Sequence, residues 1–170
     1  MTKEDFLKDV QNWDNHRHLL WPALEFTHNS TNGVVEMGMG QGSTPFLHQY
    51  CEDAKRPLFS YENNLEWLNK FSHLESPLHK ITHVVDWDVV SKIHPEPSVI
   101  LIDHAPGERR YIDVQRFANS AKIIVIHDSE PEATGYMMDR IWGLFKYRKD
   151  FTSPGAWATM VSNFVDVSKL

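Results

Sequence analysis

The segment from Val34 to Thr44 (VVEMGMGQGST) constrains the fold more than any other part of the chain. Two valines end an apolar run, an acidic residue follows, and three glycines then alternate with other residues. Glycines at these positions allow the backbone to turn sharply and to approach a ligand closely. Ser43 or Thr44 is suited to cap the helix that follows. The segment therefore predicts a strand, a tight turn and a helix N-terminus, which together form a nucleotide-binding corner.

The composition is that of an ordinary globular chain. The length of 170 residues predicts a single domain over residues 1–170. The net charge of −6 provides no basic surface, so we expect no nucleic-acid partner. The single cysteine, Cys51, excludes an internal disulfide and a cysteine zinc cluster. The N-terminus has no apolar signal region and no apolar run approaches membrane-spanning length, so we expect a cytoplasmic location and no membrane contact.

Apolar periodicity and turn residues predict strands that alternate with helices. The expected strands are residues 33–37, 58–62, 79–85, 99–102, 122–126, 144–151 and 156–164. The expected helices are residues 3–12, 16–27, 44–53, 63–72, 89–93, 109–120 and 131–141. Five β–α repeats followed by a hairpin predict an α/β fold. We expect a single Rossmann-like three-layer domain, with a mostly parallel seven-stranded sheet and a C-terminal antiparallel hairpin.

Polar side chains follow the five strands that are expected to be parallel. They are Glu36, Glu62, Asp86, Asp103 and the pair His127-Asp128. Any one of them alone is equally well explained as a turn residue or a helix cap. Because ligands bind outside the carboxyl ends of parallel strands, five in succession indicate an acidic rim around one crevice.

The rim favours an adenosine ligand with a cationic amino-acid end. Glu62 is placed to accept both hydroxyl groups of a ribose. Asp86 offers an acceptor for an exocyclic amine, and Trp87 offers an indole face for a purine. Glu36 lies where a phosphate would otherwise bind, and its charge repels a pyrophosphate but attracts an ammonium or sulfonium group.

Together with the acids that follow the later strands, residues 36–42 resemble the first motif of the class I S-adenosylmethionine-dependent methyltransferases. The dinucleotide-binding motif instead requires a glycine at the position that Ser43 occupies in this chain. The likeness extends over residues 33–164 and implies that S-adenosyl-L-methionine is the cofactor. It also implies a helical lid over residues 1–28 and a cofactor-binding core over residues 33–170. The implied cofactor-binding residues are Glu36, Gly38, Gly40, Gly42, Ser43, Thr44, Glu62, Asn63, Asp86, Trp87 and Asp103.

Two later segments resemble the metal-dependent small-molecule O-methyltransferases of the catechol O-methyltransferase type. Asp103-His104 and Arg110-Tyr111 match that family with two extra residues between them, and His127-Asp128 replaces its Asp-Asn pair. The lysine that serves as the family's base is missing between Asp103 and Arg109. The resemblance implies O-methylation of a small hydroxylated substrate, with Asp103, His104 and His127 as the catalytic residues.

A divalent cation is a further expectation at this site. Asp103, His127 and Asp128 are the predicted ligands, and this set suits Mn, Fe or Zn at least as well as Mg. The alternative is a metal-free site in which Asp103 or His127 is a general base and Asp128 caps the next helix.

The sequence leaves two other functions open. One is an S-adenosylmethionine-binding regulatory module without turnover. The other is a nicotinamide-dependent oxidoreductase on the same topology, which Glu36 and the glycine spacing oppose. The chain has no insertion that could form a substrate domain, which favours a small-molecule substrate or a homo-oligomer that completes the site.

Overall fold

The computed structural model describes residues 1–131 and 136–170, and these form a seven-stranded sheet between two layers of helices. The strands are β1 (Val34–Met37), β2 (Leu58–Glu62), β3 (His79–His83), β4 (Val99–Ile102), β5 (Ile123–His127), β6 (Tyr147–Ser153) and β7 (Ala156–Ser162). The α-helices are α1 (Lys3–Phe6), α2 (Arg17–Phe26), α3 (Thr44–Ala54), α4 (Leu65–Phe71), α5 (Asp88–Ile93) and α6 (Arg110–Phe117).

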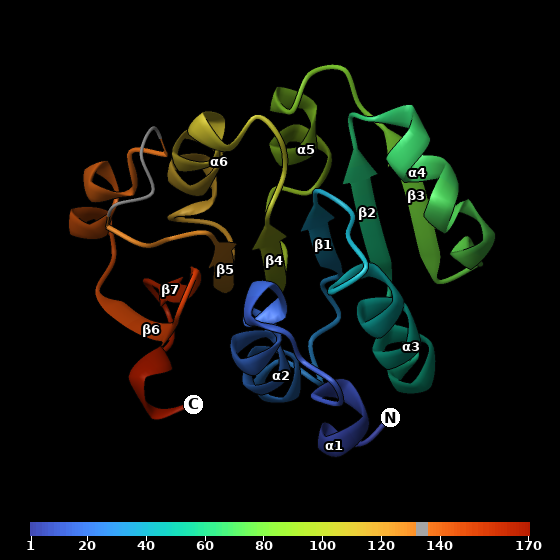
Figure 1. Ribbon diagram of the computed structural model, residues 1–170, viewed down its shortest axis with the longest axis horizontal. Coiled ribbons are helices and arrows are strands. Elements are labelled where there is room, and N and C mark those ends of the chain that lie inside the picture. Colours follow the sequence, from blue (N-terminus) through green and yellow to red (C-terminus); the bar gives the residue numbers. More distant parts are fainter. Residues whose placement is uncertain (132–135) are drawn as a thin grey trace.

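The strand order is β3-β2-β1-β4-β5-β7-β6 (Figure 1). The first five strands are parallel, whereas β7 runs antiparallel to both β5 and β6. The α/β class, the mostly parallel sheet and the antiparallel C-terminal hairpin predicted from the sequence are therefore confirmed.

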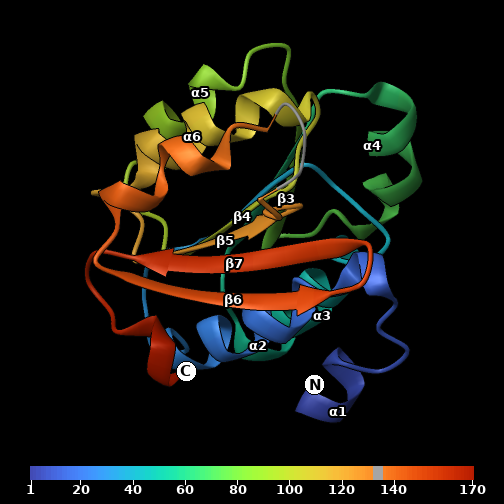
Figure 2. The same ribbon diagram turned by 60° about the vertical axis from the view of Figure 1, so that its left-hand side comes forward.

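Alternate side chains of the central strands point to opposite faces of the sheet and are buried there. Val34 and Leu101 pack in the layer that contains α1, α2 and α3. Val35, Ile100 and Ile102 pack in the layer that contains α5 and α6. Figure 2 shows the sheet almost edge-on, with α1 to α3 on one side and α4 to α6 on the other. Burial on both faces explains why β4 and β5 are continuous apolar runs in the sequence.

Helix α2 is an integral part of one of these layers. Leu19, Leu20 and Leu24 are at most 2% exposed, and the helix contacts β4, β5 and β7. Pro22 lies inside α2 without ending it. Helix α2, which makes up most of the second half of the helical lid predicted over residues 1–28, therefore packs on the sheet itself.

Several expected elements differ from the observed ones. The strand expected over residues 144–151 is observed as β6, Tyr147–Ser153, after a 3-10 turn at Trp142–Leu144. The first helix ends at Phe6, and Asp9 adopts a left-handed φ of 54°, which no continuous helix allows. Strand β3 stops at His83. Val84 still donates its backbone N–H to the carbonyl of Glu62, whereas Val85 points away from the sheet and is 91% exposed. Of the expected helix 131–141, residues 132–135 lie outside the described residues. The remainder holds only a 3-10 turn, Met138–Arg140, because Met137 has a φ of 55°.

The described part of the chain contains no helix that is long and apolar enough to cross a membrane.

Candidate functional site

The candidate site lies where the chain crosses from one side of β1 to the other. Strand β1 pairs with β2 on one edge and with β4 on the other, which makes its carboxyl end the topological switch point of the sheet. Gly38 follows β1 with a φ of +92°, and a Cβ atom there would lie 2.5 Å from the carbonyl oxygen of Asp103. Only glycine allows the loop after β1 to pass this close to the loop after β4.

Glu36 holds the loop after β1, residues 38–42, in place from inside the protein; we call this segment the glycine loop. Its carboxylate accepts hydrogen bonds from the hydroxyl groups of Ser43 at 2.6 Å, Thr44 at 3.0 Å and Ser60 at 2.5 Å. Burial raises the pKa of Glu36 to about 7, although these three hydrogen bonds act in the opposite direction. Ser43 does occupy the cap position of α3, but its hydroxyl bonds Glu36 and not the helix. Direct attraction of a cationic ligand does not fit this position, because Glu36 has no exposed surface.

A cavity of about 440 Å³ opens beside the glycine loop. Its lining residues come from the glycine loop, from the end of β2 and the start of α4, and from the loop after β4: Met39, Glu62, Asn63, Asn64, Trp67, Asp103 and Ala105. Three of the predicted cofactor-binding residues, Glu62, Asn63 and Asp103, thus line one cavity.

Glu62 is the fixed acceptor in this cavity. Its Oε2 accepts the backbone N–H of Met39 at 2.9 Å, and its Oε1 accepts the backbone N–H of Asn64 at 2.8 Å. A carboxylate has about four lone-pair directions, so two further acceptor positions are available for ligand hydroxyl groups.

Trp67 and Asn64 are cavity residues that were not predicted from the sequence. The indole N–H of Trp67 donates to the carbonyl of Met39, which ties α4 to the glycine loop. Asn63 donates through Nδ2 to the carbonyl of Ala105 at 3.0 Å and so joins the loops after β2 and β4. The available signal was a tryptophan one turn into the helix that follows the acid at the end of β2.

Asp86 and Trp87 lie at the edge of this region but do not line the cavity. Asp86 is exposed and accepts the backbone N–H of Asp88 at 2.9 Å, which is the turn-forming role considered as its alternative. Trp87 is buried, and its indole N–H donates to the carbonyl of Ala105 at 3.0 Å. Neither residue is placed beside Glu62 by these contacts, so their predicted roles in adenine binding stay predictions.

The structure gives His104 a packing role. Its ring is fully buried, stacks on the indole of Trp87 at 4.4 Å, and lies with Nε2 3.0 Å from Oδ2 of Asp113 on α6. The predicted catalytic role of His104 does not fit this position, because the side chain is enclosed between β4 and the helices and has no surface toward a substrate.

Asp103 and His127 meet at the carboxyl ends of β4 and β5. Oδ1 of Asp103 lies 3.2 Å from Nδ1 of His127 and 3.0 Å from a guanidinium nitrogen of Arg110. Asp128 contacts the same two partners, at 3.1 Å from His127 and 2.9 Å from Arg110. Arg110 also donates to the carbonyls of residues 103, 104 and 127. Arg110 therefore fixes the loops that follow both strands.

Asp103, Arg110, His127 and Asp128 form one charged cluster, and each of the carboxylates and the imidazole titrates under the influence of the others. Burial raises the pKa of Asp103, but the neighbouring His127 and Arg110 outweigh it and hold that pKa below its usual range. Burial alone would lower the pKa of His127, yet its hydrogen bonds and attraction to Asp103 and Asp128 raise it to about 10. The pair of carboxylates thus favours a cation at the position of His127.

His16 joins this cluster from the start of α2. Its ring lies edge-on to the ring of His127, with the centroids 4.8 Å apart. Burial lowers the pKa of His16 to about 3, so the ring is neutral. His16 is not among the site residues that were predicted from the sequence. Of the predicted metal ligands, Asp103 and His127 have possible ligand atoms within 4.8 Å of one in His16. Asp128 instead pairs with Arg110 through Oδ2 and with His127 through Oδ1.

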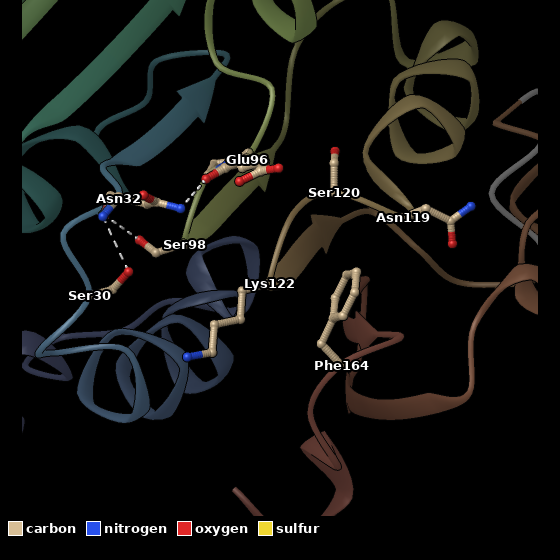
Figure 3. Close-up of a pocket in the computed structure, with 9 residues that line it drawn as sticks. Ser30, Asn32, Glu96, Ser98, Asn119, Ser120, Lys122 and Phe164 are labelled. Carbon is tan, nitrogen blue, oxygen red and sulfur yellow. Dashed lines mark hydrogen bonds between the residues drawn. The ribbon is translucent and has the colours of Figure 1, made fainter.

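A second cavity, of about 400 Å³, lies at the opposite ends of the parallel strands (Figure 3). It is bordered by residues that precede β1, β4 and β5, including Asn32, Ser98 and Lys122. Asn32 donates to the carbonyl of Glu96 at 2.8 Å, and Ser98 donates to the carbonyl of Asn32 at 2.9 Å. None of the predicted site residues lines this cavity, and it lies at the amino ends of the strands. We therefore place the candidate site at the carboxyl ends.

The strand order, the glycine loop and the acid after β2 define the fold of the class I S-adenosylmethionine-dependent methyltransferases. Among solved structures, the O-methyltransferase TomG from Streptomyces achromogenes, in complex with SAM, matches at a TM-score of 0.64 and 11% identity, over 90% of this chain and 81% of its own. An O-methyltransferase from Bacillus cereus, in complex with SAH, matches at 0.63 and 10% identity, over 94% of each chain.

The same comparison also finds an enzyme that is not named a methyltransferase. Spermidine synthase from Thermotoga maritima matches at a TM-score of 0.62 and 18% identity, over 92% of this chain and 61% of its own. No protein-family model and no curated protein sequence matches the chain. At these identities the likeness establishes the fold, and the reaction has to be argued from the site.

Proposed function

We propose that this protein is an S-adenosylmethionine-dependent methyltransferase that methylates a hydroxyl group of a small molecule. One observation supports this most: the Glu62 carboxylate is held in a cavity between the glycine loop and the loop after β4, at the switch point of the sheet. Solved structures of the same fold contain SAM or SAH.

The cavity residues fit the adenosine part of this cofactor. Glu62 retains acceptor positions for the two ribose hydroxyl groups. Trp67 and Asn63 border the same space with an indole and an amide. When bound, S-adenosylmethionine supplies an electrophilic methyl group on a positively charged sulfur.

Asp103 is the residue that connects the cofactor cavity to the substrate side. Its carboxylate lines the cavity and contacts His127 at 3.2 Å. A carboxylate at this position can accept a hydrogen bond from a substrate hydroxyl and orient its oxygen. The described residues form no inserted domain, so we expect the substrate to be a small molecule, bound by the loops after β4 and β5 and by the N-terminal segment.

Calorimetry followed by an activity assay tests this proposal. We expect the protein to bind S-adenosylmethionine and then to transfer the methyl group to a member of a panel of sugars, catechols and other hydroxylated compounds, detected by mass spectrometry. Binding of NAD without binding of S-adenosylmethionine would reject the proposal. Tight cofactor binding with no transfer to any acceptor would instead favour a regulatory module.

A further inference from the structure

We propose that His16, Asp103 and His127 form a binding site for one divalent transition-metal ion. One ring nitrogen of each histidine and one carboxylate oxygen of Asp103 all lie within 4.8 Å of one another. The set differs from the one expected from the sequence, because the third ligand comes from the N-terminal segment and not from Asp128.

Buried nitrogen atoms without partners point to a ligand at this place. His16 is 2% exposed, and neither of its ring nitrogens makes a hydrogen bond of normal geometry, although the backbone of Gly42 lies near the ring. His127 is 7% exposed, and its Nε2 is also buried without a partner. Buried polar atoms in proteins are almost always paired, so unpaired nitrogens on two neighbouring buried rings beside one carboxylate indicate an absent partner. One metal ion would satisfy one nitrogen of each ring.

The residues on either side of His16 hold it in this position. Asn15 donates through Nδ2 to the carbonyl of Ala156 at 2.7 Å and to the hydroxyl of Ser153 at 3.0 Å. Arg17 is buried and donates through Nε to the carbonyl of Phe6 at 2.8 Å. His16 is thus fixed between β7 and the N-terminal turn, and its position does not depend on its own side chain.

The distances allow an ion to bind with little movement. Imidazole and carboxylate ligands lie about 2.0–2.2 Å from a transition-metal ion, so two ligands of one ion are at most about 4.4 Å apart. The present separation of up to 4.8 Å requires only a small closure. Both contacts of the Asp103 carboxylate with Arg110 and His127 involve Oδ1, which leaves Oδ2 to face an ion.

The ligand types select the metal. Two imidazoles and one carboxylate suit Mn²⁺, Fe²⁺, Co²⁺ or Zn²⁺, whereas Mg²⁺ prefers oxygen ligands. Three ligands leave coordination positions open for a further oxygen atom. Metal binding would replace the proton that the two carboxylates otherwise favour on His127.

In this arrangement Asp128 would hold the ring of His127 in place without binding the ion itself. Its Oδ1 lies 3.1 Å from Nδ1 of His127, while its Oδ2 pairs with Arg110 at 2.9 Å. A carboxylate that accepts the second ring N–H of a ligating histidine orients the ring toward the ion. Asp128 is therefore a positioning residue for His127.

The ion would lie next to the cofactor cavity, because Asp103 borders both. An ion there would bind the substrate hydroxyl and lower its pKa, which favours attack on the methyl group. This consequence rests on the proposed function. The presence of the metal site does not, since it can be measured without cofactor or substrate.

Titration of the metal-free full-length protein with Co²⁺ and Zn²⁺ tests the site. We expect one ion per chain by calorimetry. His16→Gln should weaken binding by more than about 100-fold, beyond the range of 10–100-fold that is typical of outer residues such as Asp128. His73→Gln removes an exposed histidine and is the matched control, with unchanged affinity expected. Absence of stoichiometric binding to the wild type, or equal affinities of the two variants, would overturn the proposal.

A second variant identifies the ligand directly. In His16→Cys, Co²⁺ should produce a thiolate-to-cobalt charge-transfer band that the wild type lacks, because Cys51 is 1% exposed and lies in the apolar core. The band requires contact between residue 16 and the ion, so a merely structural role of His16 would not generate it. A folded His16→Cys protein that binds Co²⁺ without the band would reject His16 as a ligand. Calorimetry with S-adenosylmethionine on the metal-free protein tests the proposed function separately.

Discussion

At the scale of single residues, Glu62 is the most direct test of the cofactor cavity. Glu62→Gln keeps the size of the side chain but removes the charge that strengthens hydrogen bonds from ribose hydroxyl groups. We expect S-adenosylmethionine to bind more weakly by about 1.5–3 kcal/mol, the usual contribution of a hydrogen bond to a charged group. Calorimetry measures this difference. Glu75→Gln, on an exposed turn, is the control; equal affinities of the two variants would show that the ribose binds elsewhere.

Glu36 makes the stability of the protein depend on pH. Its pKa is about 7 in the folded protein and 4.5 as the ordinary value. Between these pH values the folded state binds more protons than the unfolded state, so Glu36 lowers the free energy of unfolding as pH rises from about 4.5 to 7. The full effect is roughly 3 kcal/mol, from the size of the shift.

Comparison with Glu36→Gln isolates this effect from those of other titrating groups. The variant cannot ionise, so its stability relative to the wild type should increase by roughly 2.5 kcal/mol between pH 5 and pH 8. Urea denaturation without cofactor at both pH values measures it. A constant difference between the two proteins would mean that Glu36 does not titrate in this range.

At the scale of elements, the glycine loop is constrained by both conformation and space. Gly38 and Gly155 have nearly the same φ, +92° and +93°, but only Gly38 has backbone atoms where a Cβ would lie. Gly155→Ala should therefore cost only the strain of a left-handed residue, about 1–3 kcal/mol. Gly38→Ala should cost more, because the strand-end loops must also separate. Equal losses of stability on thermal unfolding would show that the loops yield easily.

The elements were predictable from the sequence where a local pattern determined them. Continuous apolar runs located β4 and β5, and the glycine loop located the end of β1. The first helix and the segment after residue 136 were not predictable, because isolated left-handed residues, Asp9 and Met137, break helical patterns without glycine or proline. Local patterns indicate the type of an element but not such single-residue interruptions.

The site was predictable only in part, for a related reason. The residues that follow strands, such as Glu62 and Asp103, could be placed because the carboxyl ends of parallel strands share one edge. His104 follows Asp103 directly, yet it points into the core, since the orientation of a loop side chain depends on tertiary packing. His16 lies 87 residues before Asp103 in the sequence, and no local spacing relates the two.

At the scale of the whole molecule, the N-terminal segment connects the fold to the site. Helix α2 covers the sheet over β4, β5 and β7, and His16 at its start lies at the ring of His127. A segment that only closed over the cofactor would be separable from the core. The burial of Leu19, Leu20 and Leu24 instead makes α2 part of the core, which positions His16 rigidly.

Leu20→Ala distinguishes these two roles of α2. Leu20 is fully buried in the layer with Leu101 and Val125, so its truncation leaves a cavity in the core. We expect the free energy of unfolding to fall by about 2–5 kcal/mol in urea denaturation. Leu65→Ala, at a position that is 57% exposed on α4, should change it by less than about 0.5 kcal/mol. If α2 were a detachable lid, the two variants would be equally stable, because opening of the lid would absorb the loss without unfolding the sheet.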